Sequence, residues 1–291
     1  MSDKRAHELL LSADKKAQQK GWFSGPKYDE AGELYEQASN QFKLSKQMRE
    51  AGEAMEKAAQ MSLKLDEPDD AAQRFITAAK AFKKSHPQQA VSMLEQAVAI
   101  LTERGRFHIA ASHQKEIART YEEDLSNLAD AMRAYQLAAE WYADEGSSAL
   151  ASSCLLKVAS FAAQLEKYDQ AIEIFETVAE GSLDNQLAKW SIKEYFFKAA
   201  LCRLAVPDEV GTAEALERYK DLDPSFGKTR ECLFLEEIVA DINKGDLQSF
   251  TDHIASFDQI SQLDNWKTTL LLRVKRHISE AEDDLTHMYY E

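Results

Sequence analysis

The sequence contains few residues that interrupt helices and no pattern typical of strands. Its 291 residues include only ten glycines and five prolines, and no proline lies between residues 88 and 206. Proline breaks the interior of a helix, and glycine weakens it. Runs of β-branched residues with a period of two, which mark strands, are also missing. These absences leave helix as the expected structure of most of the chain.

Patterns that carry catalysis or bind metals are lacking too. There is no glycine-rich phosphate loop, and no two histidines have the spacing of a zinc-binding helix. The closest histidines, His108 and His113, would point more than about 90° apart on a helix. The cysteines, Cys154, Cys202 and Cys232, are too widely spaced for a metal site or a disulfide framework, which indicates small buried side chains in a reducing compartment. We therefore expect a binding scaffold, not an enzyme, without a metal or cofactor.

The composition also limits which cellular compartment and which binding partners are expected. Apolar residues make up 44% of the chain and charged residues 29%, as in globular soluble proteins. No apolar run approaches the roughly 20 residues that a membrane-spanning helix needs, and residues 9–11 are too short a core for a signal peptide. The formal net charge of −15 disfavours nucleic acid as a partner. We expect a cytoplasmic protein that attracts acidic partners only through local basic patches.

An alanine repeat organises the first 180 residues. Its leading alanines recur every 19 to 21 residues, at Ala31, Ala51, Ala71, Ala90, Ala110, Ala131, Ala151 and Ala171. Four residues later stands a large apolar residue: Tyr35, Met55, Phe75, Leu94, Tyr135, Leu155 or Phe175, with Gln114 as the exception. Seven or eight residues after the leading alanine comes a second one, at Ala38, Ala58, Ala78, Ala97, Ala118, Ala138, Ala159 and Ala179. These positions share one face of a helix, so each segment presents a small–large–small surface to its neighbours.

A period of twenty residues corresponds to one helix and one turn. Helix breakers separate the segments at residues 67–68, 86–87, 104–105 and 145–146. Two segments make a hairpin of about forty residues, and such hairpins stack into tetratricopeptide-like superhelices. The sequence thus predicts an all-α fold: a helical-hairpin solenoid over residues 1–180, a helical bundle packed on it over 181–279, and an acidic tail over 280–291.

The bundle is predicted from helical stretches in which the repeat is lost. We expect a strongly apolar, buried helix over 190–206, then helices over about 209–222, 228–243, 246–260 and 263–279. The last has an apolar seam at Trp266, Leu270, Val274 and Ile278 and a basic outer face with Lys267, Arg273, Lys275 and Arg276. The acidic tail is expected to be frayed.

Several long segments resemble one family, the soluble NSF attachment proteins of the alpha type, over nearly the whole chain. They are GWFSG at 21–25, AAKAFKKSHPQQA at 78–90, GRFHIAA at 105–111, CLLKVASFAAQLEKYDQAI at 154–172, KEYFFKAALC at 193–202, LDNWKTTLLLRVK at 263–275 and EDDL at 282–285. The resemblance implies an adaptor that coats a SNARE four-helix bundle and recruits the hexameric AAA ATPase NSF, which pulls the bundle apart after membrane fusion.

The resemblance also assigns candidate contacts to the SNARE bundle. They are Lys83, Lys84, Arg106, Lys157, Leu187 and Lys193. The competing interpretation is an ordinary solvated charge at each basic residue, and a core position for Leu187. Two positions that are commonly lysine in the family are Ser112 and Ser153 here. This leaves open how strongly basic the groove is in which the solenoid would hold its partner.

The contacts to the ATPase are placed near the C-terminus. The resemblance assigns them to Asp208, Asp241, Glu282, Asp283, Asp284 and Leu285. The acidic cluster usual in the helix after Asp208 is reduced here to Asp241, for which Glu236 and Glu237 could compensate. Six residues, 286–291, follow Leu285, so this leucine is not the penultimate residue as it is in the family.

Two large apolar side chains, Trp22 and Phe23, stand in an expected loop between Gly21 and Gly25. They match the membrane-touching loop of the family and would give weak peripheral binding, since burial of both rings is worth about 5 kcal/mol. The alternative is that both rings pack under the first hairpin.

Two other functions fit a helical scaffold. One is a different tetratricopeptide-like protein that holds peptide tails, and the other is a regulatory subunit of another complex. A peptide clamp would concentrate its basic contacts within three hairpins, whereas a protein that binds a rod would spread them along the groove.

Overall fold

A computed structural model describes residues 2–19, 27–185, 189–206 and 209–289, with side chains within 4–19, 27–185, 190–206 and 211–279. Within these ranges the chain forms fourteen α-helices and one short 3-10 helix, and it contains no strand. The all-α prediction is therefore confirmed. No helix of the described part is both long and apolar enough to cross a membrane.

The chain divides into two compact units, Met1–Cys154 and Leu155–Glu291. The first contains α1 (Ser2–Ala17), α2 (Tyr28–Leu44), α3 (Met48–Lys64), α4 (Pro68–Phe82), α5 (Pro87–Glu103), α6 (Phe107–Glu123), α7 (Leu128–Asp144) and the start of α8 (Ser148–Gln164). The second contains the rest of α8, α9 (Tyr168–Glu180), α10 (Lys189–Leu204), α11 (Glu209–Leu222), η2 (Phe226–Lys228), α12 (Arg230–Lys244), α13 (Leu247–Asp258) and α14 (Asn265–Tyr289). The boundary that we expected at residue 181 lies inside the second unit and stays a prediction.

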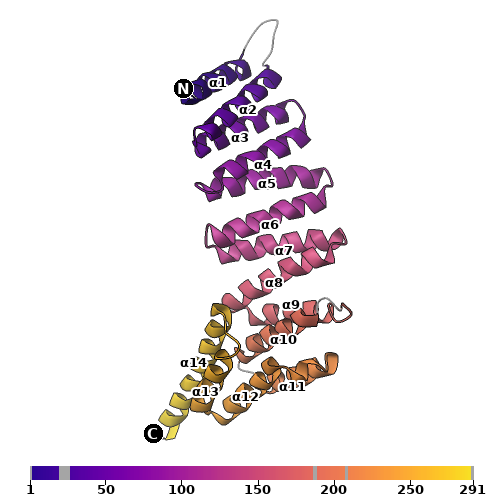
Figure 1. Cartoon of the computed structure of the whole chain (residues 1–291), viewed down its shortest axis with the longest axis vertical. Coiled ribbons are helices and arrows are strands. Elements are labelled where there is room, and N and C mark those ends of the chain that lie inside the picture. Colours follow the sequence, from indigo (N-terminus) through magenta and orange to yellow (C-terminus); the bar gives the residue numbers. More distant parts are fainter. Residues whose placement is uncertain (1, 20–26, 186–188, 207–208, 290–291) are drawn as a thin grey trace. The chain divides into compact units, whose positions relative to one another are not determined.

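In the first unit, successive helices run antiparallel and pack against one another in chain order (Figure 1). The leading and second alanines of the predicted repeat are all buried. So are the large residues between them, except that Leu155 is half-buried while Cys154, one position earlier, is fully buried. The small–large–small helix surface predicted from the sequence is therefore confirmed as the repeating core.

Small residues are needed where neighbouring helices approach most closely. Gly52 of α3 lies against the ring of Phe82 in α4, and a Cβ atom at this glycine would stand 2.6 Å from ring carbons. Real side chains do not tolerate such a distance, so this crossing requires glycine unless the ring moves.

Most of the described turns between helices share one hydrogen-bonding pattern, whereas the α4–α5 turn closes with an N–H of His86 that donates to the Phe82 carbonyl four residues earlier. Backbone N–H groups such as those of Gln47, Glu67 and Arg106 donate to carbonyls five residues earlier, which closes the preceding helix. The pattern places one residue per turn in the left-handed region: Lys46, Asp66, Gly105, Ser126, Gly146 and Glu166. All four predicted breaker sites lie at helix boundaries, and Pro68 and Pro87 are the first residues of α4 and α5.

The second unit is built around α10, as the apolar sequence predicted. Phe196 stacks on Tyr219 of α11 at a ring distance of 4.5 Å, and Phe197 contacts the rings of Phe234 and Phe257. Burial fails at the first turn of α10, where Trp190 is 79% exposed. The expectation of a wholly buried helix was wrong at this residue, because its ring lies on the side of the helix that carries Lys193.

The last helix, α14, is longer than expected and includes most of the predicted tail. No glycine or proline occurs between residues 265 and 289, and glutamate, alanine and leucine favour helix. Its seam residues Leu270, Val274 and Ile278 are buried. The expected basic outer face is smaller than predicted, because Lys267 binds Glu194 and Arg273 donates to carbonyls at the end of α8.

Candidate functional site

The first unit places three predicted SNARE contacts at the ends of helices. Lys83 and Lys84 follow α4, and Lys83 Nζ lies 3.2 Å from Glu116 Oε1 on α6. His113 and Lys83 together lower the pKa of Glu116 to about 2, with His113 as the larger cause. Lys84 is exposed and makes no ion pair within the described residues. One of the two adjacent lysines is thus held by the protein, and the other is available at the surface.

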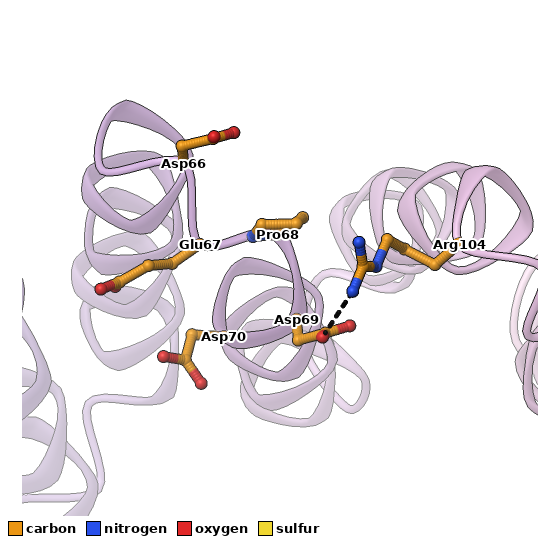
Figure 2. Close-up of a pocket in the computed structure, with 6 residues that line it drawn as sticks. All are labelled: Asp66, Glu67, Pro68, Asp69, Asp70 and Arg104. Carbon is orange, nitrogen blue, oxygen red and sulfur yellow. Dashed lines mark hydrogen bonds and ion pairs between the residues drawn. The ribbon is translucent and has the colours of Figure 1, made fainter.

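The third contact, Arg106, precedes α6 and is paired with the first turn of α4. Its Nη1 lies 3.3 Å from Oδ1 of Asp69 and its Nη2 3.4 Å from Oδ2. Arg104 reaches the same carboxylate, with 3.4 Å between Nη2 and Oδ2, as Figure 2 shows. In the same view Asp70 points away from Arg104. Two guanidinium groups therefore share one half-exposed carboxylate.

The surroundings of this pair carry charges of both signs. Asp66, Glu67, Pro68, Asp69, Asp70 and Arg104 line an open hollow of about 380 Å³. Farther along the first unit, Ser112 and Ser153 are both exposed, so the two positions that depart from the family pattern present neutral groups at the surface. Of the three predicted basic contacts in this unit, Lys83 and Arg106 have acidic partners and Lys84 is exposed.

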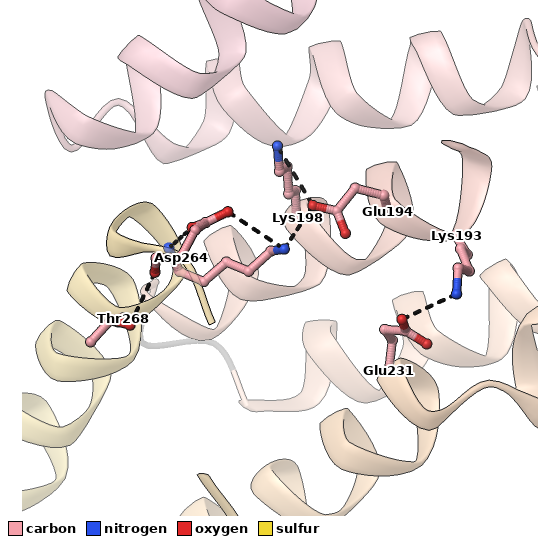
Figure 3. A network of polar contacts seen from close by, with 7 residues as sticks. Lys193, Glu194, Lys198, Glu231, Asp264 and Thr268 are labelled. Atoms are coloured by element: carbon pink, nitrogen blue, oxygen red, sulfur yellow. Dashed lines mark hydrogen bonds and ion pairs between the residues drawn. The ribbon is translucent and has the colours of Figure 1, made fainter. Parts of the chain in front are cut away.

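The second unit carries the other two basic candidates. Lys157 on α8 is exposed, and its Nζ lies 5.9 Å from the ring centre of Phe161. Lys193 on α10 lies 3.2 Å from Glu231 Oε1 on α12, as Figure 3 shows, and 5.5 Å from the ring centre of Trp190. Sequence reasoning missed the exposure of Trp190, because an apolar run does not reveal which of its residues lacks a covering helix.

Other charges in Figure 3 tie helices of the second unit together. Lys198 lies 3.7 Å from Glu194 on the same helix, and its Nζ sits 5.5 Å from the ring centre of Trp266 on α14. Lys267 links Glu194 to Asp264, at 2.8 and 3.6 Å. These cations have structural partners on several sides, which separates them from the more exposed Lys193.

Of the predicted ATPase contacts, Asp241 is the one with a described side chain, and it is buried. It is 5% exposed, and its Oδ2 lies 2.6 Å from His253 Nδ1 on α13. Asp241 thus holds α12 and α13 together and is not presented to a partner as expected. Of the compensating residues, Glu236 is bound by Lys220, while Glu237 is exposed.

Several predicted site residues cannot be placed. Trp22, Phe23, Leu187 and Asp208 lie outside the described residues, and so do the side chains of Glu282, Asp283, Asp284 and Leu285 within α14. Their roles stay predictions.

The described residues offer no group of three or more His, Cys, Asp or Glu side chains that could hold a metal ion. All three cysteines are buried, as predicted. Burial raises the pKa of the Cys202 thiol to about 12 and that of Cys232 to about 11, which suppresses the reactive thiolate.

Fold and surface together define a tetratricopeptide-like helical repeat protein with exposed basic side chains at helix ends. The model of the family described as "Soluble NSF attachment protein, SNAP" matches residues 4–279. The chain is 43% identical over 283 residues to the "Probable vesicular-fusion protein sec17 homolog" of Schizosaccharomyces pombe, covering 96% of this chain and 98% of that protein. It is 41% identical over 286 residues to the "Alpha-soluble NSF attachment protein" of Mus musculus, covering 96% and 97%. It is 40% identical over 292 residues to the "Beta-soluble NSF attachment protein" of Bos taurus, covering 97% and 98%. The chain belongs to the soluble NSF attachment protein family.

Proposed function

We propose that this protein is an adaptor that binds SNARE complexes, recruits the AAA ATPase NSF and stimulates it to disassemble them during vesicle fusion. The observation that carries the proposal is the family match across residues 4–279, together with relatives named for NSF attachment and vesicular fusion. The stacked helices of the first unit are consistent with it, since such repeats hold a rigid surface against a long partner.

The SNARE complex is proposed to meet the basic residues of both units. The basic residues that the resemblance predicts have exposed or half-exposed side chains: Lys83, Lys84, Arg106, Lys157 and Lys193. Exposed charges mainly steer and orient an acidic partner and add modest affinity. Leu187 is the proposed apolar contact.

Contacts to the membrane and to NSF complete the proposal. Trp22 and Phe23 would insert weakly into the membrane surface, so that the cytoplasmic protein associates peripherally where several copies gather on one membrane-tethered bundle. Asp208, Glu282, Asp283, Asp284 and Leu285 are proposed to meet basic surfaces of NSF. Asp241 is left out because it is buried against His253.

A reconstituted disassembly assay tests this function. Purified protein should capture detergent-solubilised SNARE complex, and SNARE disassembly should require the protein, NSF and ATP together. Charge reversal at Arg106 and Lys157 should weaken capture at low salt, where contacts between exposed charges are screened least. The circular dichroism spectrum should be unchanged, because neither side chain belongs to the core. Deletion of residues 280–291 should leave capture near normal and reduce ATPase stimulation, whereas deletion of 286–291 should do little.

The outcomes separate this function from the other scaffolds. If the intact chain captures no SNARE complex at low salt, the adaptor function is wrong. If it captures the complex and NSF remains unstimulated, the SNARE contact holds and the recruitment step is wrong.

A further inference from the structure

Three of the predicted SNARE-binding cations already have an acidic partner within the chain. Lys83 lies 3.2 Å from Glu116, Arg106 lies 3.3 Å from Asp69, and Lys193 lies 3.2 Å from Glu231. Each pair joins different helices or turns, and its members are separated by 33 to 38 residues in the sequence. These pairs therefore result from the fold and not from neighbouring positions on one helix.

Asp69 is the most heavily used of these carboxylates. Arg104 and Arg106 both approach it at 3.3 to 3.4 Å, while Asp70, the next residue, is exposed and pairs with neither arginine (Figure 2). Asp69 stands in the first turn of α4, directly after Pro68, where the helix dipole favours a negative charge. The carboxylate is thus fixed in position before any partner arrives.

The strength of these pairs suits exchange with a partner. The Arg106 and Asp69 side chains are 48% and 43% exposed, and exposed ion pairs of this kind are individually weak. The other two pairs are less exposed, at 36% and 29% for Lys83 and Glu116 and at 31% and 18% for Lys193 and Glu231, but solvent still reaches both of their cations. An acidic partner can therefore replace the internal carboxylate. The net gain from each contact is then reduced by the pair that is given up.

On this basis we propose that Asp69, Glu116 and Glu231 are internal competitors that limit the affinity of the protein for the acidic surface of a SNARE bundle. The inference rests on the proposed adaptor function, because it names the residues that regulate that same contact. Neutralising a competitor should tighten binding, whereas neutralising an unpaired acid nearby should not.

The sharpest test compares Asp69→Asn with Asp70→Asn. Both variants remove one negative charge from the same turn of α4, so they change the net charge and the helix dipole interaction alike. We expect the Kd for purified SNARE complex at low salt to fall about two- to fivefold for Asp69→Asn relative to Asp70→Asn. The difference should shrink as salt rises, because the freed guanidinium groups act through screened contacts.

A second comparison examines the other unit. Glu231→Gln should tighten binding relative to Glu173→Gln, which removes an exposed charge on α9 that pairs with no described residue. We expect a smaller gain, below about threefold, because Glu231 occupies a single lysine and not two arginines. Glu116 is less suitable for this test, because it also contacts His113.

Replacing the arginines themselves tests the mechanism. On an Arg104→Gln, Arg106→Gln background, Asp69→Asn should shift the Kd no more than Asp70→Asn does, since no arginine remains to be released. Thermal unfolding of each variant checks that the fold is kept.

Three outcomes would overturn the inference. Equal Kd values for Asp69→Asn and Asp70→Asn in the otherwise intact chain would show that the carboxylate does not compete. A gain that persists without the two arginines would show that it acts by another route. If the intact chain does not bind SNARE complex, the proposed function fails and the inference fails with it; binding by the intact chain with no gain in Asp69→Asn refutes the inference alone.

Discussion

The two compact units fill their interiors with different side chains. In the first, alanines recur at every helix contact, and single large residues such as Tyr35 and Phe75 fill the space between them. In the second, aromatic rings pack on aromatic rings, with Phe196 on Tyr219 and Phe234 on Phe257 at 4.5 and 4.3 Å. A core of small residues has little free space, so added atoms destabilise it. A core of aromatic rings is destabilised most when a ring is removed and a cavity remains.

The second unit also contains a buried charge cluster. Glu176 of α9 is 9% exposed and accepts hydrogen bonds from Arg203, at 3.0 and 2.8 Å, and from Tyr219. Arg218 adds an ion pair at 2.5 Å. Burial alone would raise the pKa of Glu176, but these partners outweigh it and lower the pKa. These polar contacts join α9 to α10 and to α11.

The largest effect is expected from removing a ring in the second unit. Phe196→Ala should lower the free energy of unfolding by about 3–5 kcal/mol, because the fully buried ring contacts both Tyr219 and Phe226. Urea unfolding followed by circular dichroism measures the loss. Trp190→Ala on the same helix is the control and should change little, since its ring is exposed. A loss below 1 kcal/mol for Phe196→Ala would contradict the aromatic-core description.

The buried charge cluster should give the next effect. Glu176→Gln keeps the shape of the side chain and removes the charge that Arg203 and Arg218 share, so we expect a loss of about 1.5–3 kcal/mol. Glu180→Gln, an exposed position on the same helix, is the matched control and should stay within about 0.5 kcal/mol. Equal unfolding midpoints for the two variants in urea would show that the cluster does not stabilise the unit.

Added atoms test the first unit. Gly52→Ala places a Cβ atom 2.6 Å from the Phe82 ring, so the ring or the helix must shift at a cost of about 1–3 kcal/mol. Gly227→Ala is the matched change in the second unit, where the new atom would meet the Lys220 side chain at 3.3 Å, which can move aside. Thermal unfolding should show the larger loss for Gly52→Ala. The reverse order would contradict the contrast between the units.

The difference between the units also explains what the sequence could reveal. Regular spacing predicted the helices of the repeat, its buried alanines and the breaks at Pro68 and Pro87, because each depends only on local geometry. The sequence did not predict the left-handed conformation of Lys46, Ser126 and Glu166, because these turn positions are not glycine. Backbone hydrogen bonds close the turns in which these residues stand. Their conformation follows from the packing of the helices on either side.

The candidate site shows the same limit. The positions of its basic residues came from the resemblance, but their pairing did not, because Arg106 and Asp69 are 37 residues apart and meet only when the fold brings the α5–α6 turn to the start of α4. Asp241 was assigned to an ATPase contact by the resemblance, yet the fold buries it against His253. The local sequence does not specify which acids and bases will face each other.

The smallest effect concerns the pH dependence of that contact. The pKa of His253 is raised, first by its hydrogen bond with Asp241 and then by the carboxylates of Asp241, Glu237 and Asp252. Because the folded-state value lies above the unfolded value of about 6.5, the contact stabilises the protein fully below that pH. The contribution is lost as the pH rises through the folded-state pKa. Since the ring is 37% exposed, solvent screening keeps the contribution below about 1 kcal/mol.

Replacing the histidine isolates this contribution. The Tm difference between the intact protein and His253→Gln should be larger at pH 5.5 than at pH 8.5, because the protonated ring gains a charge interaction with Asp241 that the neutral ring lacks. His86→Gln, at the α4–α5 turn of the first unit, is the control, since its ring contacts the neutral Ser85 hydroxyl and no carboxylate in the described structure. A difference for His253→Gln that is constant across this range would mean that the contact between α12 and α13 depends on ring packing and not on charge.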